Sequence, residues 1–219
     1  MSTIFDLLKQ HEKALENVLI SRAFLSSAPN KYEWTNKIFT NSNIRRAHLD
    51  CIDVINTKKL FMMHLCIFPE VHLPSPIYGF DIIAGPNKVT GAFLDFSPII
   101  ENHPLSTWYH ELTENVTWSK ARTLPDWAKR IFSSNMIAAG NITSIQELNT
   151  ILELSLVMLH KYFDLVDSVI TENNYTSNQN YYCQQQKCNP HTPRVLNSIG
   201  FSKELTYDFI HNCLFPEIV

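Results

Sequence analysis

The sequence predicts an α+β fold in which helices pack on an antiparallel sheet. Segments rich in aromatic residues, Ile and Val run from Tyr32 to about Ser97, and short turn signals separate them. Because none of these separations is long enough for a crossover helix, adjacent strands should run antiparallel. Helical patterns dominate the rest of the chain, and strands grouped together before a group of helices are typical of the α+β class.

The first expected element is an amphipathic helix over residues 4–25. Apolar residues recur there at helical spacing, and charged residues occupy the opposite face. A meander of about five strands is then expected over residues 32–97. Its turns are predicted at 41–43, 56–59, 69–76 and 85–88.

Helices follow the last strand. Segments 104–114 and 125–134 are expected to be short helices. The clearest helical pattern spans residues 143–171, where Ser144 is a candidate N-cap and Glu147 follows three residues later. These segments should cover the sheet.

The C-terminal part of the chain predicts a broken helix. A polar stretch should be helical up to Asn189 and Pro190, because proline cannot continue the helical hydrogen bonds. A short helix should then run to Gly200, and a last one should cover about 202–213.

Composition indicates one globular domain over residues 1–219. At 219 residues the chain is long enough for one substantial core, or at most two small ones, and with 45% hydrophobic and 18% charged residues it has the balance of a globular protein, so a single domain is the default. Charged residues are scattered through the first twenty positions, so we expect no signal peptide. No later run approaches the roughly 20 apolar residues of a membrane span. We therefore expect a cytoplasmic protein that does not contact a membrane. A monomer is expected as well, although these observations leave the oligomeric state open.

Two further observations exclude common functions. The net charge is −3, which argues against a nucleic-acid binder. The chain has five glycines, and none stands in GxGxxG or GxxxxGK spacing, so neither a dinucleotide fingerprint nor a phosphate loop is present. If the protein is a redox enzyme, its electrons should not come from a nicotinamide on a Rossmann fold.

Ionisable residues interrupt three consecutive apolar strands. His64 stands in FMMHLCIFPE, Asp81 in IYGFDIIAGP, and His48 and Asp50 share one face of AHLDCIDVI. In a meander these side chains could be cross-strand neighbours at about 5 Å. A single histidine or aspartate in such a strand is more often structural.

Together, however, the acids and imidazoles indicate chemistry. An aspartate in an apolar strand must be paired or protonated, and a histidine on the next strand is the obvious partner for Asp81. Such a pair suits proton donation to a substrate held against the sheet. Metal binding is less expected, because no third and fourth ligands stand at recognisable spacing.

Three stretches carry a resemblance to the ferredoxin-dependent bilin reductases. They are RRAHLD at 45–50, HLCIFPEVHLPSPIYGFDIIAGPNKVTGAFLDFSP at 64–98 and YCQQQKCNPHTPRVL at 182–196. Their order and spacing agree with the family over about residues 32–215. The resemblance implies a three-layer α/β/α sandwich with a central antiparallel sheet, and biliverdin IXα bound between the sheet and the C-terminal helices.

The resemblance also implies a type of chemistry. Family members bind no metal or organic cofactor, ferredoxin delivers electrons one at a time, and side chains supply protons. Protonating the conjugated bilin makes it a cation, which accepts an electron more readily. By position, His64 and Asp81 match the central pair of the family, with the aspartate as principal proton donor, and His48 matches a histidine close to that pair.

Other matches concern the edges of the bilin. Arg122, in RTLPDW, matches an arginine that binds a propionate, and Thr90 matches a small hydroxyl residue near a propionate. Asn189 stands where the family has Asn or Asp near the bilin. His191 departs from the family, because the phycocyanobilin-forming members have a propionate-binding lysine there.

Asp50 is a second departure from the phycocyanobilin-forming members, which have a glutamate needed to reduce the D-ring vinyl group. Removing one methylene withdraws the carboxylate by more than about one ångström, which can disable a proton transfer that needs hydrogen-bond contact. The resemblance therefore favours phycoerythrobilin as product, with phycocyanobilin as the alternative.

Ferredoxins are acidic, so the resemblance also implies a basic docking surface. The candidates are Arg45, Arg46, Lys120, Lys129, Arg130, Lys187 and Arg194. A bilin-binding carrier without chemistry is the rival from another class, although a carrier does not need a buried acid. A lipocalin-like barrel is disfavoured by the extensive helices after residue 143.

Overall fold

The computed structural model, which describes residues 3–26 and 32–219, contains a seven-stranded antiparallel sheet whose strands follow one another in chain order. The strands are β1 (Phe24–Leu25), β2 (Thr35–Thr40), β3 (Ile44–Val54), β4 (Leu60–Pro69), β5 (Ile77–Ala84), β6 (Val89–Ser97) and β7 (Ile137–Ala139). The meander expected over 32–97 is confirmed as β2–β6. A short helical turn, α2 (Ile55–Lys58), joins β3 to β4.

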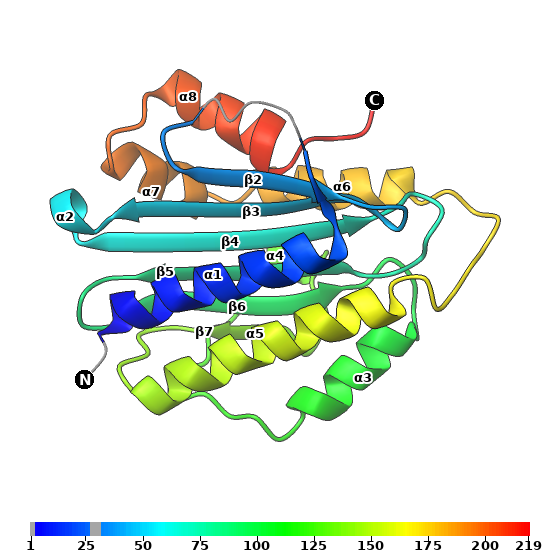
Figure 1. Ribbon diagram of the computed structural model, residues 1–219, viewed down its shortest axis with the longest axis horizontal. Helices are drawn as coiled ribbons and strands as arrows, with labels where there is room; N and C mark the ends of the chain where they lie inside the picture. Colours follow the sequence, from blue (N-terminus) through cyan, green and yellow to red (C-terminus); the bar gives the residue numbers. More distant parts are fainter. Residues whose placement is uncertain (1–2, 27–31) are drawn as a thin grey trace.

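One layer of helices covers the face of the sheet that is nearer in Figure 1. It consists of α1 (Ile4–Arg22), α3 (Pro104–Thr113) and α5 (Ile145–Leu165). Thr3 begins α1 with a capping box, and Ser144 caps α5 as expected. Leu8 of α1 and Leu159 of α5 join Leu65 and Phe80 of the sheet in one buried apolar cluster.

The second layer lies on the opposite face (Figure 1). Its elements are α4 (Asp126–Lys129), α6 (Thr176–Lys187), α7 (His191–Ser198), α8 (Lys203–Asp208) and the π-helix η1 (Phe209–Leu214). A second apolar cluster joins Tyr182, Leu196 and Phe209 of this layer to Ile52 and Phe68 of the sheet. The expected α/β/α sandwich with a central antiparallel sheet is therefore confirmed.

Several boundaries differ from the sequence expectations. The first helix ends at Arg22, because Ala23 takes an extended conformation, and β1 follows within the segment expected to be helical. The helix expected over 125–134 is limited to Asp126–Lys129. Ser133 bonds to the sheet residue Asp95 instead, which draws the chain back toward β6.

Other differences concern the C-terminal half. The helix expected over 143–171 ends at Leu165. The last expected helix divides into α8 and η1, and π-helical turns are frequent beside functional sites. Strand β7 was not expected. The single domain expected over 1–219 includes residues 1–2 and 27–31, which lie outside the described residues.

Within residues 3–26 and 32–219, no helix has both the length and the apolar character needed to cross a membrane.

Candidate active site

Asp50, His64 and Asp81 form a row across the middle of the sheet. Asp50 on β3 pairs with His64 on β4, and His64 pairs with Asp81 on β5. Directly opposed residues of antiparallel strands project to the same face. The three side chains therefore lie on the face covered by α6, α7 and η1, and the sequence expectation that they are neighbours agrees with this register.

A cavity of about 420 Å³ opens above this row. The sheet supplies one wall, the segment around Trp127 and Phe132 a second, and the C-terminal helices the third, through residues such as Asn189 and Phe215. Cavities of this size commonly hold small organic ligands. The polar row therefore lies at the base of a mainly apolar cavity.

Both acids of the row are protonated more easily than ordinary aspartates. Burial raises the pKa of Asp50 to about 8. A hydrogen bond from Trp34 lowers this pKa, and the negative charge of Asp81 makes a smaller contribution that raises it. Burial also raises the pKa of Asp81 to about 7. Asp81 is partly buried, Asp50 is buried, and both line the cavity. Near neutral pH both side chains can therefore hold a proton to donate.

The histidine between the acids is neutral. Burial, together with a smaller contribution from the positive charge of Arg46, lowers the pKa of His64 to about 4. Among the described residues, Nδ1 of His64 has no hydrogen-bond partner. A neutral imidazole can accept a proton on one nitrogen and donate one from the other, so His64 can pass protons between neighbours.

His48 lies beside this row and does not line the cavity. It is fully buried, its ring centroid lies 6.1 Å from that of His64, and its Nε2 is hydrogen-bonded to Asn36. Burial holds the pKa of His48 well below its usual range. The structure therefore brings His48 close to the central row, as expected, but His48 is not one of the residues that line the cavity.

Arg122 and Thr90 line the cavity where it reaches the surface. Arg122 is exposed, and its guanidinium group donates to the backbone carbonyl of Thr90 and lies 5.8 Å from the ring centroid of Phe93. The hydroxyl of Thr90 donates to the carbonyl of Ile83 at 3.0 Å. Arg122 therefore offers its remaining N–H groups to an anion, whereas the proton of the Thr90 hydroxyl is already used.

Asn189 and His191 lie at the break between α6 and α7, and both line the cavity. The side chain of Asn189 accepts a hydrogen bond from the backbone N–H of His191 at 2.9 Å and donates to Thr192 at 3.2 Å. Pro190 separates the two helices, as expected. The break thus turns both polar side chains toward the ligand space.

Asp95 and Trp34 are among the residues of this site that sequence reasoning missed. Asp95 on β6 is buried, lines the cavity, and accepts hydrogen bonds from Ser97 and from the backbone of Ser133. Burial raises its pKa to about 6, although these hydrogen bonds lower it. Trp34, just before β2, donates from Nε1 to Asp50 at 2.6 Å. The available signal for Asp95 was its position two residues after Phe93, on the same strand face.

The aspartates and histidines of this site are not arranged as the ligands of a metal ion in the part of the chain that the structure describes. Among residues 3–26 and 32–219, no group of three or more His, Cys, Asp or Glu side chains is arranged to hold a metal ion.

Comparison with known proteins finds relatives over most of the chain. A family model described as "Ferredoxin-dependent bilin reductase" matches residues 6–216. Phycocyanobilin:ferredoxin oxidoreductase from Prochlorococcus marinus is 30% identical over 189 residues, which cover 82% of this chain and 74% of the relative. The enzyme of the same name from Gloeobacter violaceus is 27% identical over 189 residues, covering 82% of this chain and 72% of the relative.

Two solved structures are also similar. The structure of a protein named PcyX has a TM-score of 0.72 and 32% sequence identity, and the match covers 97% of this chain and 99% of that chain. Phytochromobilin synthase from tomato, solved in complex with biliverdin, has a TM-score of 0.74 and 18% identity over 94% of this chain and 82% of that one. At that lower identity the likeness concerns the fold alone.

Proposed function

The chain belongs to the ferredoxin-dependent bilin reductase family and is an oxidoreductase of that class, and we propose that it reduces biliverdin IXα to a phycobilin with single electrons from ferredoxin. One observation carries the proposal within this chain. Asp50, His64 and Asp81 lie in one row at the base of a cavity, where they can deliver protons to a bound ligand.

The cavity suits an open-chain tetrapyrrole. Its walls are mostly apolar, as the conjugated part of such a ligand requires, and two basic side chains, Arg122 and His191, line it at the surface side. Biliverdin carries two propionate groups, which need charged or polar partners. We propose that Arg122 binds one propionate and that His191 and Asn189 contact the ligand at the helix break.

The central row supplies the protons. An electron added to a protonated bilin gives a neutral radical, and a second electron and proton complete one reduction. Asp81 is the proposed donor, since it faces the cavity and its pKa of about 7 keeps part of it protonated under ordinary conditions. Neutral His64, directly opposite, is proposed to orient the ligand and to return a proton to Asp81.

Asp50 is proposed to influence which phycobilin is formed. Its carboxyl group lies at the far side of His64 from Asp81, lines the cavity and has a pKa of about 8, so it can serve as a second proton donor. Its short side chain reaches less far than the glutamate expected of phycocyanobilin-forming enzymes. We propose phycoerythrobilin as the product, with phycocyanobilin as the alternative.

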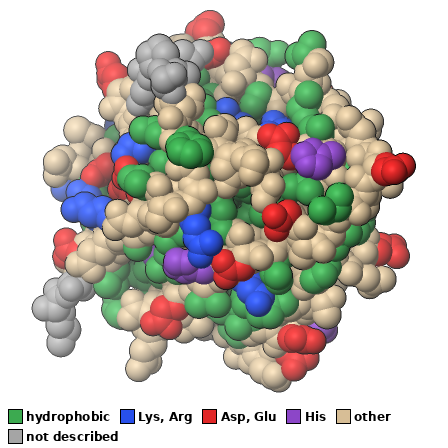
Figure 2. Space-filling view, turned by 45° about the vertical axis from the view of Figure 1, so that its right-hand side comes forward, with side chains coloured by type: hydrophobic (Ala, Val, Ile, Leu, Met, Phe, Trp, Pro, Cys, Tyr) green, Lys and Arg blue, Asp and Glu red, His purple; other side chains and the backbone are tan. Residues whose placement is uncertain are grey.

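Docking of ferredoxin is proposed to use exposed basic residues. Of the seven candidates, Lys120, Lys129, Arg130 and Arg194 are exposed. Arg45 and Arg46 are partly buried and bond to Gln179 and to the backbone of Cys213, so they contribute little to a docking surface. Figure 2 shows basic and acidic side chains interspersed on the face that it draws.

Electrostatic docking would show a characteristic salt dependence. If acidic ferredoxin is attracted by these side chains, the rate should fall as ionic strength rises from a low value. We also propose that the enzyme acts as a cytoplasmic monomer without nucleic acid or membrane, and that it needs no bound metal or organic cofactor. Light scattering and metal analysis of the purified protein test the oligomeric state and the metal content.

A bilin carrier without catalysis is the rival function. The two groups that hold protons at the cavity favour the enzyme, because burying an acid has a cost that simple binding does not require. The test is anaerobic incubation of the protein with biliverdin, ferredoxin and a reducing system. Absorbance spectra and chromatography should show a reduced bilin in the complete mixture and none without ferredoxin. Spectral changes limited to those of binding would contradict the enzymatic proposal.

A further inference from the structure

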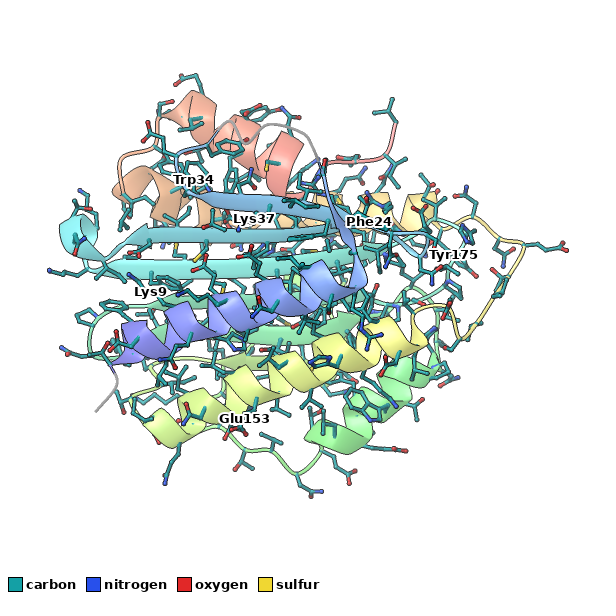
Figure 3. The ribbon with its side chains drawn as sticks, viewed as in Figure 1. Lys9, Phe24, Trp34, Lys37, Glu153 and Tyr175 are labelled. Atoms are coloured by element: carbon teal, nitrogen blue, oxygen red, sulfur yellow. The ribbon has the colours of Figure 1, made fainter. Side chains whose placement is uncertain are left out.

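Trp34 connects the proposed proton donor Asp50 to the C-terminal helices. The indole lies just before β2, and its Nε1 donates a 2.6 Å hydrogen bond to Oδ1 of Asp50. Figure 3 labels Trp34 next to β2 and the C-terminal helices. The hydrogen bond therefore fixes one oxygen of a carboxyl group that otherwise faces the cavity.

The orientation of the indole is itself fixed by three aromatic rings. The ring centroid of Trp34 lies 4.6 Å from Tyr32, 4.8 Å from Phe201 and 5.1 Å from Phe209. Packed aromatic pairs at such distances are worth about 0.5–1.5 kcal/mol beyond their buried area. Phe209 also lines the cavity. Trp34 is thus held between the ligand-covering helices and the acid.

We propose that Trp34 is a positioning residue that sets the direction and the proton affinity of the Asp50 carboxyl group, and thereby the balance of bilin products. The effect on product rests on the proposed function. With Oδ1 held by the indole N–H, rotation of the carboxyl group would break a hydrogen bond, so the direction of Oδ2 is fixed as well. A short acid with a fixed direction can reach fewer positions on the bilin.

The same hydrogen bond acts on the charge of Asp50. An N–H donor favours the ionised form of a carboxyl group, and the bond from Trp34 opposes the effect of burial on the pKa of Asp50. Loss of the N–H group should therefore leave Asp50 protonated to higher pH. Position and proton affinity should change together.

The first experiment measures the pH at which the Asp50 carboxyl group loses its proton, in protein without bilin. Infrared spectroscopy follows the carbonyl band of protonated Asp50 during a pH titration, and the band is assigned by its absence in Asp50→Asn. Trp34→Phe should raise the titration midpoint. Phe201→Leu loosens the aromatic packing but keeps the N–H group, so its midpoint should stay near that of the wild type. An equal midpoint in the wild type and Trp34→Phe would overturn the proposal.

A second substitution guards against misfolding of the phenylalanine variant. Incorporation of benzothienylalanine at position 34 replaces the indole N–H by sulfur and nearly preserves the shape of the ring. Its midpoint should rise as in Trp34→Phe. If the midpoint rises in Trp34→Phe but not with benzothienylalanine, the effect comes from packing and the proposal is wrong.

The second experiment measures the products. Trp34→Phe should change the ratio of phycoerythrobilin to phycocyanobilin about tenfold, which corresponds to about 1.4 kcal/mol and lies within the range of one ordinary intramolecular hydrogen bond. Substitution of Trp34 should also alter the effect of Asp50→Glu, since residues in contact are rarely additive. If Trp34→Phe leaves the product ratio unchanged both in the wild type and in Asp50→Glu, the proposed effect on product is wrong. If the wild type forms no bilin product, the proposed function fails, while the infrared titration still decides the role of Trp34.

Discussion

Asp81 lies directly opposite His64 across the β4–β5 pair, and both side chains line the same cavity. Burial shifts the two pKa values in opposite directions: it lowers that of His64, which stays neutral, and raises that of Asp81, which keeps its proton to higher pH. A neutral imidazole beside a protonated carboxyl group avoids the cost of two separated charges in an apolar site. The pair is therefore ready to give a proton to a ligand and to be reprotonated afterwards.

Asp81→Asn should abolish most of the reduction while leaving bilin binding intact. The amide has nearly the same shape as a protonated carboxyl group but cannot act as an acid, and loss of such a group slows a reaction by roughly 10²–10⁴-fold. Electrons that arrive without a proton should leave a bilin radical, which electron paramagnetic resonance detects. Asp126→Asn, on the exposed end of α4, is the matched control. Wild-type turnover by Asp81→Asn would refute its role as proton donor.

The rate should fall as pH rises above neutrality. The proposed mechanism uses the protonated forms of Asp81 and Asp50, whose pKa values are about 7 and about 8, so the protonated fraction declines through this range. Single-turnover rates with prereduced ferredoxin, measured from pH 6 to 9, test this expectation. A rate that increases across the same range would show that the ionised acids are the active forms.

The sheet and the central row could be predicted because strand periodicity is local. Alternation in the segments around Asp50, His64 and Asp81 places each on a defined face, and the short turns leave one plausible order of strands. The register then follows, and the structure has these residues paired directly.

Contacts between distant segments could not be predicted in the same way. The bond between Trp34 and Asp50 depends on how the chain enters β2 and on the packing of Phe201 and Phe209 from the far end of the sequence. The short helix α4 is a similar case, because Ser133 bonds to Asp95 on another element. Local propensity contains no information about either contact.

Stability should respond to the buried acid at position 50. Its pKa is about 8 in the folded protein and near 3.8 when unperturbed, so between these values the folded state binds more protons than the unfolded state. Stability due to this group is therefore lost as pH rises through that window. Asp50→Asn should unfold at a higher temperature than the wild type at pH 9, with a smaller difference at pH 5. Differential scanning calorimetry measures both.

The exposed Asp126→Asn serves as control for this experiment as well. It replaces a carboxylate by an amide at a site where burial contributes little, so its unfolding temperature should follow that of the wild type at both pH values. A difference between Asp50→Asn and the wild type that is the same at pH 5 and pH 9 would mean that Asp50 does not titrate in this range.

Asp50→Glu should move the product toward phycocyanobilin. The added methylene extends the carboxyl group toward the cavity by more than about one ångström, which can restore hydrogen-bond contact with the D-ring vinyl region. Chromatography of the products after complete turnover measures the change, and Asp50→Asn shows what is formed when this position has no acid. An unchanged product profile in Asp50→Glu would count against a role for side-chain length.

Arg122 should bind a propionate, so its removal should weaken binding of a charged bilin in particular. Arg122→Gln should lower the affinity for biliverdin about 10–100-fold, the equivalent of one hydrogen-bonded charge. The affinity for biliverdin dimethyl ester, which has no propionate charge, should change little. Absorbance titrations give both dissociation constants, and Lys120→Gln removes a nearby exposed charge as control. Equal losses for the acid and the ester would indicate that Arg122 acts through packing on Phe93.

Gly140 offers an independent test of the same contact. A Cβ atom at position 140 would overlap the Arg122 side chain, whereas one at Gly85 would meet its nearest atoms at 3.9 Å. Gly140→Ala should therefore displace the guanidinium group of Arg122 from the backbone carbonyl of Thr90. The affinity of this variant for biliverdin should fall more than its affinity for the dimethyl ester. Gly85→Ala should bind both ligands as the wild type does. If Gly140→Ala changes the affinity for neither ligand, displacing the Arg122 side chain has no effect on propionate binding. The position of Arg122 described above would then not be the one that binds the propionate.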